Sequence, residues 1–237
     1  MHHELTVITI TAASIGLFHT LLGPDHYLPF IVMARSRRWS LTKTTWITIL
    51  CGTGHVLSSI LLGIMGIALG ISIKKLETIE SFRGEIAAWI LIVFGLVYFV
   101  WGLYRALSNL PHKHWHVHED IGSQIHSHAH NKDHLHDHEG AGGKNLTPWV
   151  LFTIFVFGPC EPLIPLLIYP AAENSIFGLV LVISVFSVVT IMTMLIIVIL
   201  LSLGTNLLPM GQLERYTHAL AGATICICGI SIQFLGL

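Results

Sequence analysis

Two histidines and an aspartate lie close together in the first apolar stretch of the chain. His19 and His26 are seven residues apart, so a continuous helix would place them on nearly the same face. Pro24 interrupts such a helix, because proline has no amide proton to donate and its ring clashes with the preceding turn. Unwinding near Gly23 would let Asp25 and His26 turn toward a common cavity. Since imidazole and carboxylate groups are ligands of divalent transition metals, this stretch predicts a metal-binding site.

A second Gly-Pro motif occurs near the middle of the chain. The run Gly158-Pro159-Cys160-Glu161-Pro162 repeats the design of the first: Gly-Pro, two residues with ligand chemistry, and a further proline. Paired Gly/Pro breaks in apolar segments are typical of the binding sites of secondary transporters. Cys160 and Glu161 are therefore predicted to complete the same site. The alternatives are two coincidental kinks, and a Cys160 that is only a small buried apolar residue.

His55 is the third candidate histidine, and it follows Gly52-Thr53-Gly54 in the second apolar stretch. Small residues allow close helix approach, which would bring His55 beside the first motif. An ionisable group at the bilayer centre costs about 2.5–3.5 kcal/mol, so polar residues there are functional candidates. The alternatives are a packing histidine at position 55, and an Asp25-His26 pair that faces water at a membrane edge. The complete predicted site is His19, Asp25, His26, His55, Cys160 and Glu161.

The composition is that of an integral membrane protein. Of the 237 residues, 53% are hydrophobic and 11% are charged, whereas soluble domains are about a quarter charged. The formal net charge of -1 argues against a nucleic-acid partner. The four cysteines, Cys51, Cys160, Cys226 and Cys228, do not have the spacing of a secreted disulfide framework.

Hydropathy predicts an all-α polytopic membrane protein of six transmembrane helices. The predicted spans are residues 5–23, 44–72, 86–107, 148–170, 175–203 and 217–236. Three spans per half imply two inverted three-helix repeats, in which helices 1 and 4 are broken by proline. The predicted organisation is a first repeat over 1–107, a histidine-rich loop over 108–147 and a second repeat over 148–237.

Lysine and arginine predict the orientation in a prokaryotic inner membrane. Nine of them, Arg35, Arg37, Arg38, Lys43, Arg105, Lys113, Lys132, Lys144 and Arg215, fall in connections on one side, and three, Lys74, Lys75 and Arg83, on the other. Because cytoplasmic loops carry the excess of basic residues, both termini are predicted to be external and the histidine-rich loop cytoplasmic.

Two further groups of histidines could bind metal outside the membrane. Ten histidines occur in a polar tract with too little apolar content to fold alone: His112, His114, His116, His118, His126, His128, His130, His134, His136 and His138. A solvated linker without specific function is the alternative. His2 and His3 could hold a square-planar ion with the amino terminus, or could be a cloning remnant.

The first-half motifs resemble those of the nickel/cobalt transporter superfamily, and in particular its branch with the urease accessory transmembrane domain. The resemblance rests on the segments 19–26, 35–39 and 52–55 and on the histidine-rich loop; five residues separate His19 from Asp25, where the larger permeases of that family have four. It implies that His19, Asp25, His26 and His55 line a metal path.

The second-half motif has a different resemblance. Phe157 to Pro165 is similar to the proline-flanked cysteine motif of six-span thiol-disulfide electron carriers that serve cytochrome c maturation. Those carriers need a cysteine in each half, because exchange passes through a disulfide between two thiols. In this chain Asp25 and His26 stand at the corresponding first-half position.

Together these observations predict a transporter that is not an enzyme and that carries Ni²⁺ or Co²⁺, with Zn²⁺ as a further candidate. Its predicted partners are the metal ion, the lipid bilayer and a cytoplasmic metallochaperone. The alternatives are a thiol-disulfide electron carrier, an organic-anion or sulfite-type exporter, and a metal store or sensor that works through the tract.

Overall fold

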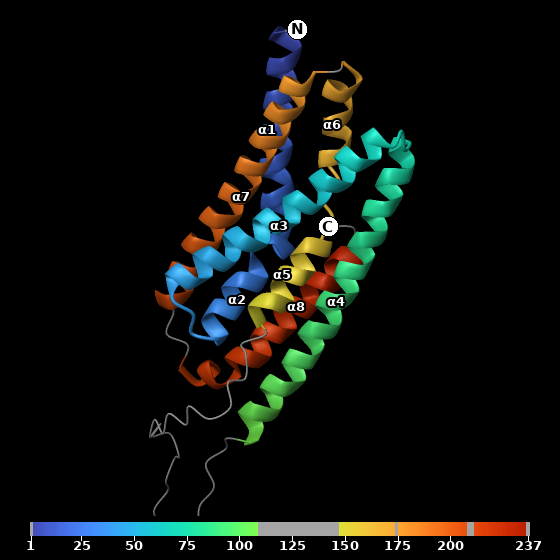
Figure 1. Ribbon diagram of the computed structural model, residues 1–237. Helices are drawn as coiled ribbons and strands as arrows, with labels where there is room; N and C mark the ends of the chain where they lie inside the picture. The colour runs from blue at the N-terminus through green and yellow to red at the C-terminus, as the bar shows by residue number, and fades with distance from the viewer. Residues whose placement is uncertain (1, 109–146, 174, 208–210, 236–237) are drawn as a thin grey trace, which may run out of the picture.

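The computed structural model describes residues 2–108, 147–173, 175–207 and 211–235, and within these ranges every regular element is a helix. The α-helices are α1 (His2–Leu22), α2 (Leu28–Ser36), α3 (Leu41–Ala68), α4 (Ile73–Ser108), α5 (Thr147–Phe157), α6 (Leu163–Ala172), α7 (Ile176–Leu207) and α8 (Thr217–Leu235). Two short 3-10 helices, η1 (Pro24–His26) and η2 (Gly211–Tyr216), precede α2 and α8. Figure 1 shows these helices as one elongated bundle.

Five of the helices, α1, α3, α4, α7 and α8, are long and apolar enough to cross a membrane. This confirms the predicted class, an all-helical integral membrane protein. The predicted fourth span, 148–170, is two shorter helices, α5 and α6, separated by the Gly158–Pro162 motif. The six-span count and the inverted repeat therefore stay predictions.

Both proline motifs break their helices. α1 ends at Leu22, Gly23 has extended backbone angles, and η1 turns the chain before α2 begins at Leu28. The sequence prediction treated residues 24–43 as a connection, whereas α2 is a largely buried helix with Phe30 and Met33 fully buried. Its nine residues are too few to produce a membrane-length hydropathy signal.

The predicted third span, 86–107, begins too late. α4 starts at Ile73 and carries Glu80 and Arg83 within the helix. These two charges lowered the hydropathy of its first part, but they pair with each other, with Arg83 Nη1 2.9 Å from Glu80 Oε2. A paired charge can be buried in a bundle where a single charge could not.

The helices pair across the two halves of the chain. α1 packs along α7, α3 contacts α5 and α6, and α4 packs along α8 over much of its length (Figure 1). The α4–α8 pair is close because glycines on each helix face backbone on the other, at Gly95, Gly102, Gly222 and Gly229. A two-fold axis that exchanges the two halves would relate the α1–α7 contact to the α3–α5 contact and the α4–α8 pair to itself. These contacts are compatible with the predicted inverted repeat, which stays a prediction.

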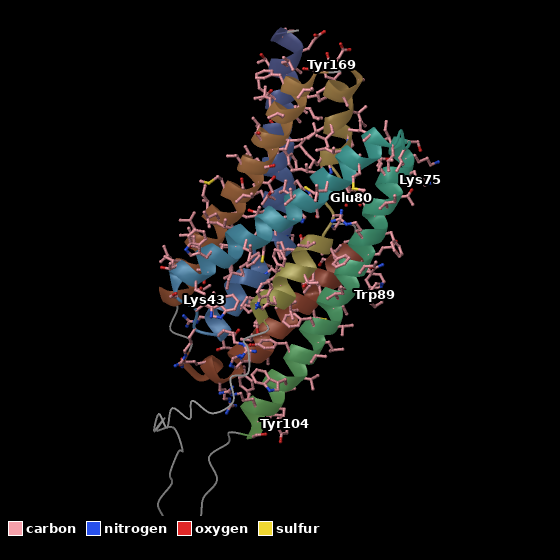
Figure 2. The ribbon with its side chains drawn as sticks, viewed as in Figure 1. Lys43, Lys75, Glu80, Trp89, Tyr104 and Tyr169 are labelled. Atoms are coloured by element: carbon pink, nitrogen blue, oxygen red, sulfur yellow. The ribbon has the colours of Figure 1, made fainter. Side chains whose placement is uncertain are left out.

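Basic residues gather at one end of the bundle. α2 ends and α3 begins there, close to the end of α4 and the start of α8, and Figure 2 labels Lys43 and Tyr104 in this region. Lys75 lies toward the opposite end. The arrangement agrees with the charge asymmetry of the sequence, while the side that faces the cytoplasm stays a prediction.

Candidate functional site

Three histidines from three elements meet inside the bundle. His19 is on the last turn of α1, His26 is on η1 and His55 is in the middle of α3. Their ring centroids are 4.7 Å apart for His19–His26, 5.1 Å for His26–His55 and 6.4 Å for His19–His55. One ring nitrogen of each lies within 4.8 Å of the others, which is the spacing of a group that could hold a metal ion. We call these three residues the histidine centre.

The hydrogen bonds of two of these rings determine which nitrogen can bind a ligand. His55 Nδ1 lies 3.3 Å from the Phe155 carbonyl oxygen, and His26 Nδ1 lies 3.2 Å from that of Gly23. A carbonyl oxygen only accepts, so each Nδ1 carries the proton and donates it, and Nε2 of the neutral ring keeps its lone pair. The Nε2 atoms of His19, His26 and His55 are buried and have no hydrogen-bond partner among the described residues. These three imidazole nitrogens are therefore the candidate ligand atoms of the histidine centre.

Asp25 supplies a negative charge next to the histidine centre. Its Oδ1 is 3.3 Å from His26 Nδ1. A carboxylate that accepts from the non-ligating nitrogen of a histidine fixes the ring's tautomer and orientation. Asp25 can therefore orient His26 while His26 Nε2 remains available.

The glycines of both motifs border the histidine centre. A Cβ added to Gly23 would lie 2.5 Å from His26 Nδ1, and one added to Gly158 would lie 3.2 Å from His55 Nδ1. Each Gly-Pro break thus passes so close to one histidine that a larger residue would displace the ring. The two breaks, 135 residues apart, meet at one place.

Gly23→Ala is expected to destabilise the protein by about 1–3 kcal/mol, because the new methyl group must push His26 aside. The matched control is Gly204→Ala on α7, where an added Cβ has no atom within 4 Å and the substitution should be neutral or slightly stabilising. Thermal unfolding in detergent, followed by circular dichroism, compares the two. Equal unfolding temperatures for both variants would show that Gly23 is not confined in this way.

A cavity of about 720 Å³ adjoins the histidine centre and reaches both helix breaks. Its lining includes His19, His26 and His55 together with three carboxylates, Asp25, Glu85 and Glu161, and no described lysine or arginine. Glu161 is exposed at the rim, so it is outside the group formed by the three imidazoles. The cavity is thus suited to cationic or neutral groups and unfavourable for anions.

Cys160 does not line this cavity. Its side chain is fully buried in an apolar cluster with Val56 and Leu163, although its neighbours Pro159 and Glu161 face the cavity. All four cysteines lie in the described residues and none forms a disulfide. Cys228 is also buried, and it is on α8, the helix that contacts η1. Cys160 therefore lies at the second break, and Cys228 is a buried cysteine on a helix that contacts the first break.

Sequence reasoning missed the ion pair between Arg83 and the buried Glu80, which Figure 2 labels between α3 and α4. Arg83 donates from Nη2 to Ser58 Oγ and to the Val156 carbonyl oxygen, both at 2.7 Å. It thereby ties α4 to α3 and to the end of α5, directly before the second break. The i, i+3 spacing of the two charges was the available signal.

Several predicted metal ligands are not part of the histidine centre. The ten histidines of the tract, 112–138, lie outside the described residues, as does Met1 beside His2 and His3. His218, which was not among the predicted ligands, lies elsewhere, with its Nδ1 2.8 Å from the Tyr98 hydroxyl.

The fold and the site define a polytopic membrane protein whose buried polar centre lies where two helix breaks meet. The family model described as "Cytochrome C biogenesis protein transmembrane region" matches residues 28–231. The chain therefore belongs to this family. No curated protein and no solved structure matches it.

This family membership overturns the assignment to the nickel/cobalt transporter superfamily, and with it the prediction of a nickel or cobalt permease. Of the segments that carried the resemblance, only 19–26 lies before the family match, which begins at residue 28; 35–39, 52–55 and the histidine-rich loop lie within it. A short His/Asp motif shows only which types of ligand are present, whereas the family match extends over seven of the eight α-helices, α2 to α8. The alternative drawn from the Cys160 motif agrees better with the family.

Proposed function

We propose that the protein is a thiol-disulfide carrier of the kind that serves cytochrome c maturation, with Cys160 as a reactive thiol. The observation that carries this proposal is the family match, because residues 28–231 include Cys160 and its proline-flanked break. The break supports the same role, since residues 158–162 have no regular helix and can move without unwinding α5 or α6.

The second thiol is Cys228. A carrier of this kind needs two thiols, because two electrons pass as one S–S bond forms or breaks. Asp25 and His26 occupy the first break, and α8, the helix that carries Cys228, contacts η1 at that break. Of the two cysteines on α8, Cys228 is the buried one.

The exchange has two balanced steps. The Cys160 thiolate attacks a partner's disulfide, forms a Cys160–partner S–S bond and releases the partner's other sulfur as a thiolate, which takes up a proton. The Cys228 thiolate then attacks the Cys160 sulfur and releases the partner's remaining sulfur. The partner gains two electrons and two protons, the carrier is oxidised to a Cys160–Cys228 disulfide, and a dithiol partner reverses the sequence.

Both sulfurs are buried, at 0% and 3% exposure for Cys160 and Cys228, so each break must open for exchange. Disulfide formation also requires the two Cα atoms to come within about 7 Å. The cavity between the two helix breaks provides space for the movement that brings the two cysteines together.

Thiol trapping in membranes that contain the full chain tests the proposal. Mild oxidation followed by alkylation and peptide mapping should give a reducible Cys160–Cys228 disulfide. A Cys226→Ser variant is the matched control and should form the same disulfide, since Cys226 faces the α4 backbone at Gly95. If Cys160 stays fully alkylatable after oxidation, the proposal is wrong.

A second function is favoured by the histidine centre, namely binding of one divalent metal ion such as Zn²⁺. Three neutral imidazoles with an open fourth position are a known zinc ligand set. The support comes from three unpartnered Nε2 atoms and a carboxylate that orients one ring. The two functions are compatible, because Cys160 does not belong to the ligand group.

A further inference from the structure

A separate cavity of about 370 Å³ opens at the basic end of the bundle, between the end of α2 and the start of α8. Its lining includes Arg35, Ser36, Arg38, Glu214, Thr217 and His218. It shares no lining residue with the cavity at the histidine centre. A ligand there would touch α2 and α8, which come from opposite halves of the chain.

The charge at this cavity is positive. Among the described lining residues, Arg35 and Arg38 face one carboxylate, Glu214. The Arg38–Glu214 contact is 3.4 Å long with both side chains largely exposed, at 83% and 66%, so it contributes little to stability and can rearrange. A group with negative oxygens would therefore meet an excess of guanidinium charge.

Polar donors around the cavity fit phosphate oxygens. Guanidinium groups bind phosphate through two parallel N–H bonds, and the hydroxyls of Ser36 and Thr217 add further donors. Trp39 also lines the cavity, and its Nε1 is buried without a hydrogen-bond partner among the described residues. Since the indole nitrogen can only donate, it requires an acceptor, which the described residues do not supply.

The exposed Trp101, whose ring lies 5.1 Å from that of the lining residue His218, supports a position of this cavity near the lipid headgroups. Arg37 stacks on Tyr98 and Trp101, at 5.3 and 5.5 Å from the ring centroids, and Arg105 lies over the same Trp101 ring. Tryptophan and tyrosine gather where a membrane protein meets the headgroup region. Basic pockets between transmembrane helices on the cytoplasmic side bind anionic headgroups.

From these observations we propose that the cavity binds the phosphodiester headgroup of an anionic membrane lipid. The bound headgroup would bridge Arg35 and Arg38 on the α2 side to Thr217 and His218 on α8. This site is independent of the thiol and histidine chemistry, so neither assignment depends on the other.

Titration with defined lipids tests the site. The full chain, purified in a neutral detergent, is supplied with phosphatidylglycerol, phosphatidylcholine or inorganic phosphate, and native mass spectrometry and thermal unfolding are recorded. Phosphatidylglycerol is expected to remain bound and raise the unfolding temperature, and the other two are not. If inorganic phosphate stabilises equally, the ligand is free phosphate and the lipid assignment is wrong.

Two double variants, one at each end of the bundle, test where the lipid headgroup binds. Arg35→Gln with Arg38→Gln should weaken phosphatidylglycerol binding about 30-fold, which corresponds to about 2 kcal/mol, or about 1 kcal/mol for each basic residue near the membrane surface. Lys74→Gln with Lys75→Gln removes the same charge at the other end of α4 and should leave affinity unchanged. If the double arginine variant does not fold, Arg38→Gln alone serves, because this side chain is 83% exposed. Equal affinities in the arginine and lysine variants would overturn the proposal.

Discussion

Cys160→Ser is expected to abolish thiol transfer without unfolding the protein. Serine has nearly the same size as cysteine, so the buried cluster around residue 160 keeps its packing, but a hydroxyl cannot form a disulfide. The measurement is the rate at which proteoliposomes reduce an external disulfide when a dithiol is enclosed. The rate should fall to that of liposomes without protein.

The other cysteines provide the controls. Cys228→Ser should stop turnover and leave Cys160 in a mixed disulfide with the partner, because no second thiol resolves it. Cys51→Ser and Cys226→Ser should transfer at the wild-type rate. Transfer by Cys160→Ser at the wild-type rate would contradict the proposed function.

His26→Ala is expected to weaken Zn²⁺ binding by at least 100-fold. Loss of a residue that only orients a ligand costs about 10–100-fold in affinity, and His26 is proposed as a direct ligand. Wild type and variant are compared by calorimetry in detergent, both with the ten tract histidines replaced by asparagine so that one class of site remains. Affinity should also fall as the pH is lowered, because protons compete for the same imidazole nitrogens.

The control for this experiment is His218→Ala, whose ring contacts Tyr98 at the basic end and is outside the histidine centre. It should bind Zn²⁺ as the wild type does. Equal affinities in His26→Ala and wild type would exclude a metal site at these three histidines and would leave the thiol function untouched.

The sequence predicted the helices that lie in lipid far better than those packed inside protein. Spans at 5–23, 44–72, 175–203 and 217–236 agree with α1, α3, α7 and α8 within a few residues, because a long apolar run has few other structures available. α2 was missed because it is short. The first part of α4 was missed because Glu80 and Arg83 are stabilised by each other and by Ser58 on α3, contacts that hydropathy does not contain.

The candidate site, like the fold, could be predicted from the sequence only in part. The two helix breaks were predicted from the chemistry of proline, and the glycines before His55 indicated that another helix approaches closely there. The pairing of His55 Nδ1 with the Phe155 carbonyl joins residues 100 positions apart, so no local pattern could predict it. The same limit applies to the contact of α8, the helix that carries Cys228, with the first break.

The close pairing of α4 with α8 imposes an order on how the protein is made. Gly95 precedes Gly222 by 127 residues, so the ribosome needs roughly 6–25 s to synthesise the partner after α4 has entered the membrane, at 5–20 residues per second. During that interval the glycine face of α4 borders lipid or a neighbouring helix. Closure of α8 onto this face completes the bundle, and it also adds Cys228, the proposed second thiol. A nascent chain that stops before residue 217 would therefore lack both its tightest helix pair and one of its two proposed thiols.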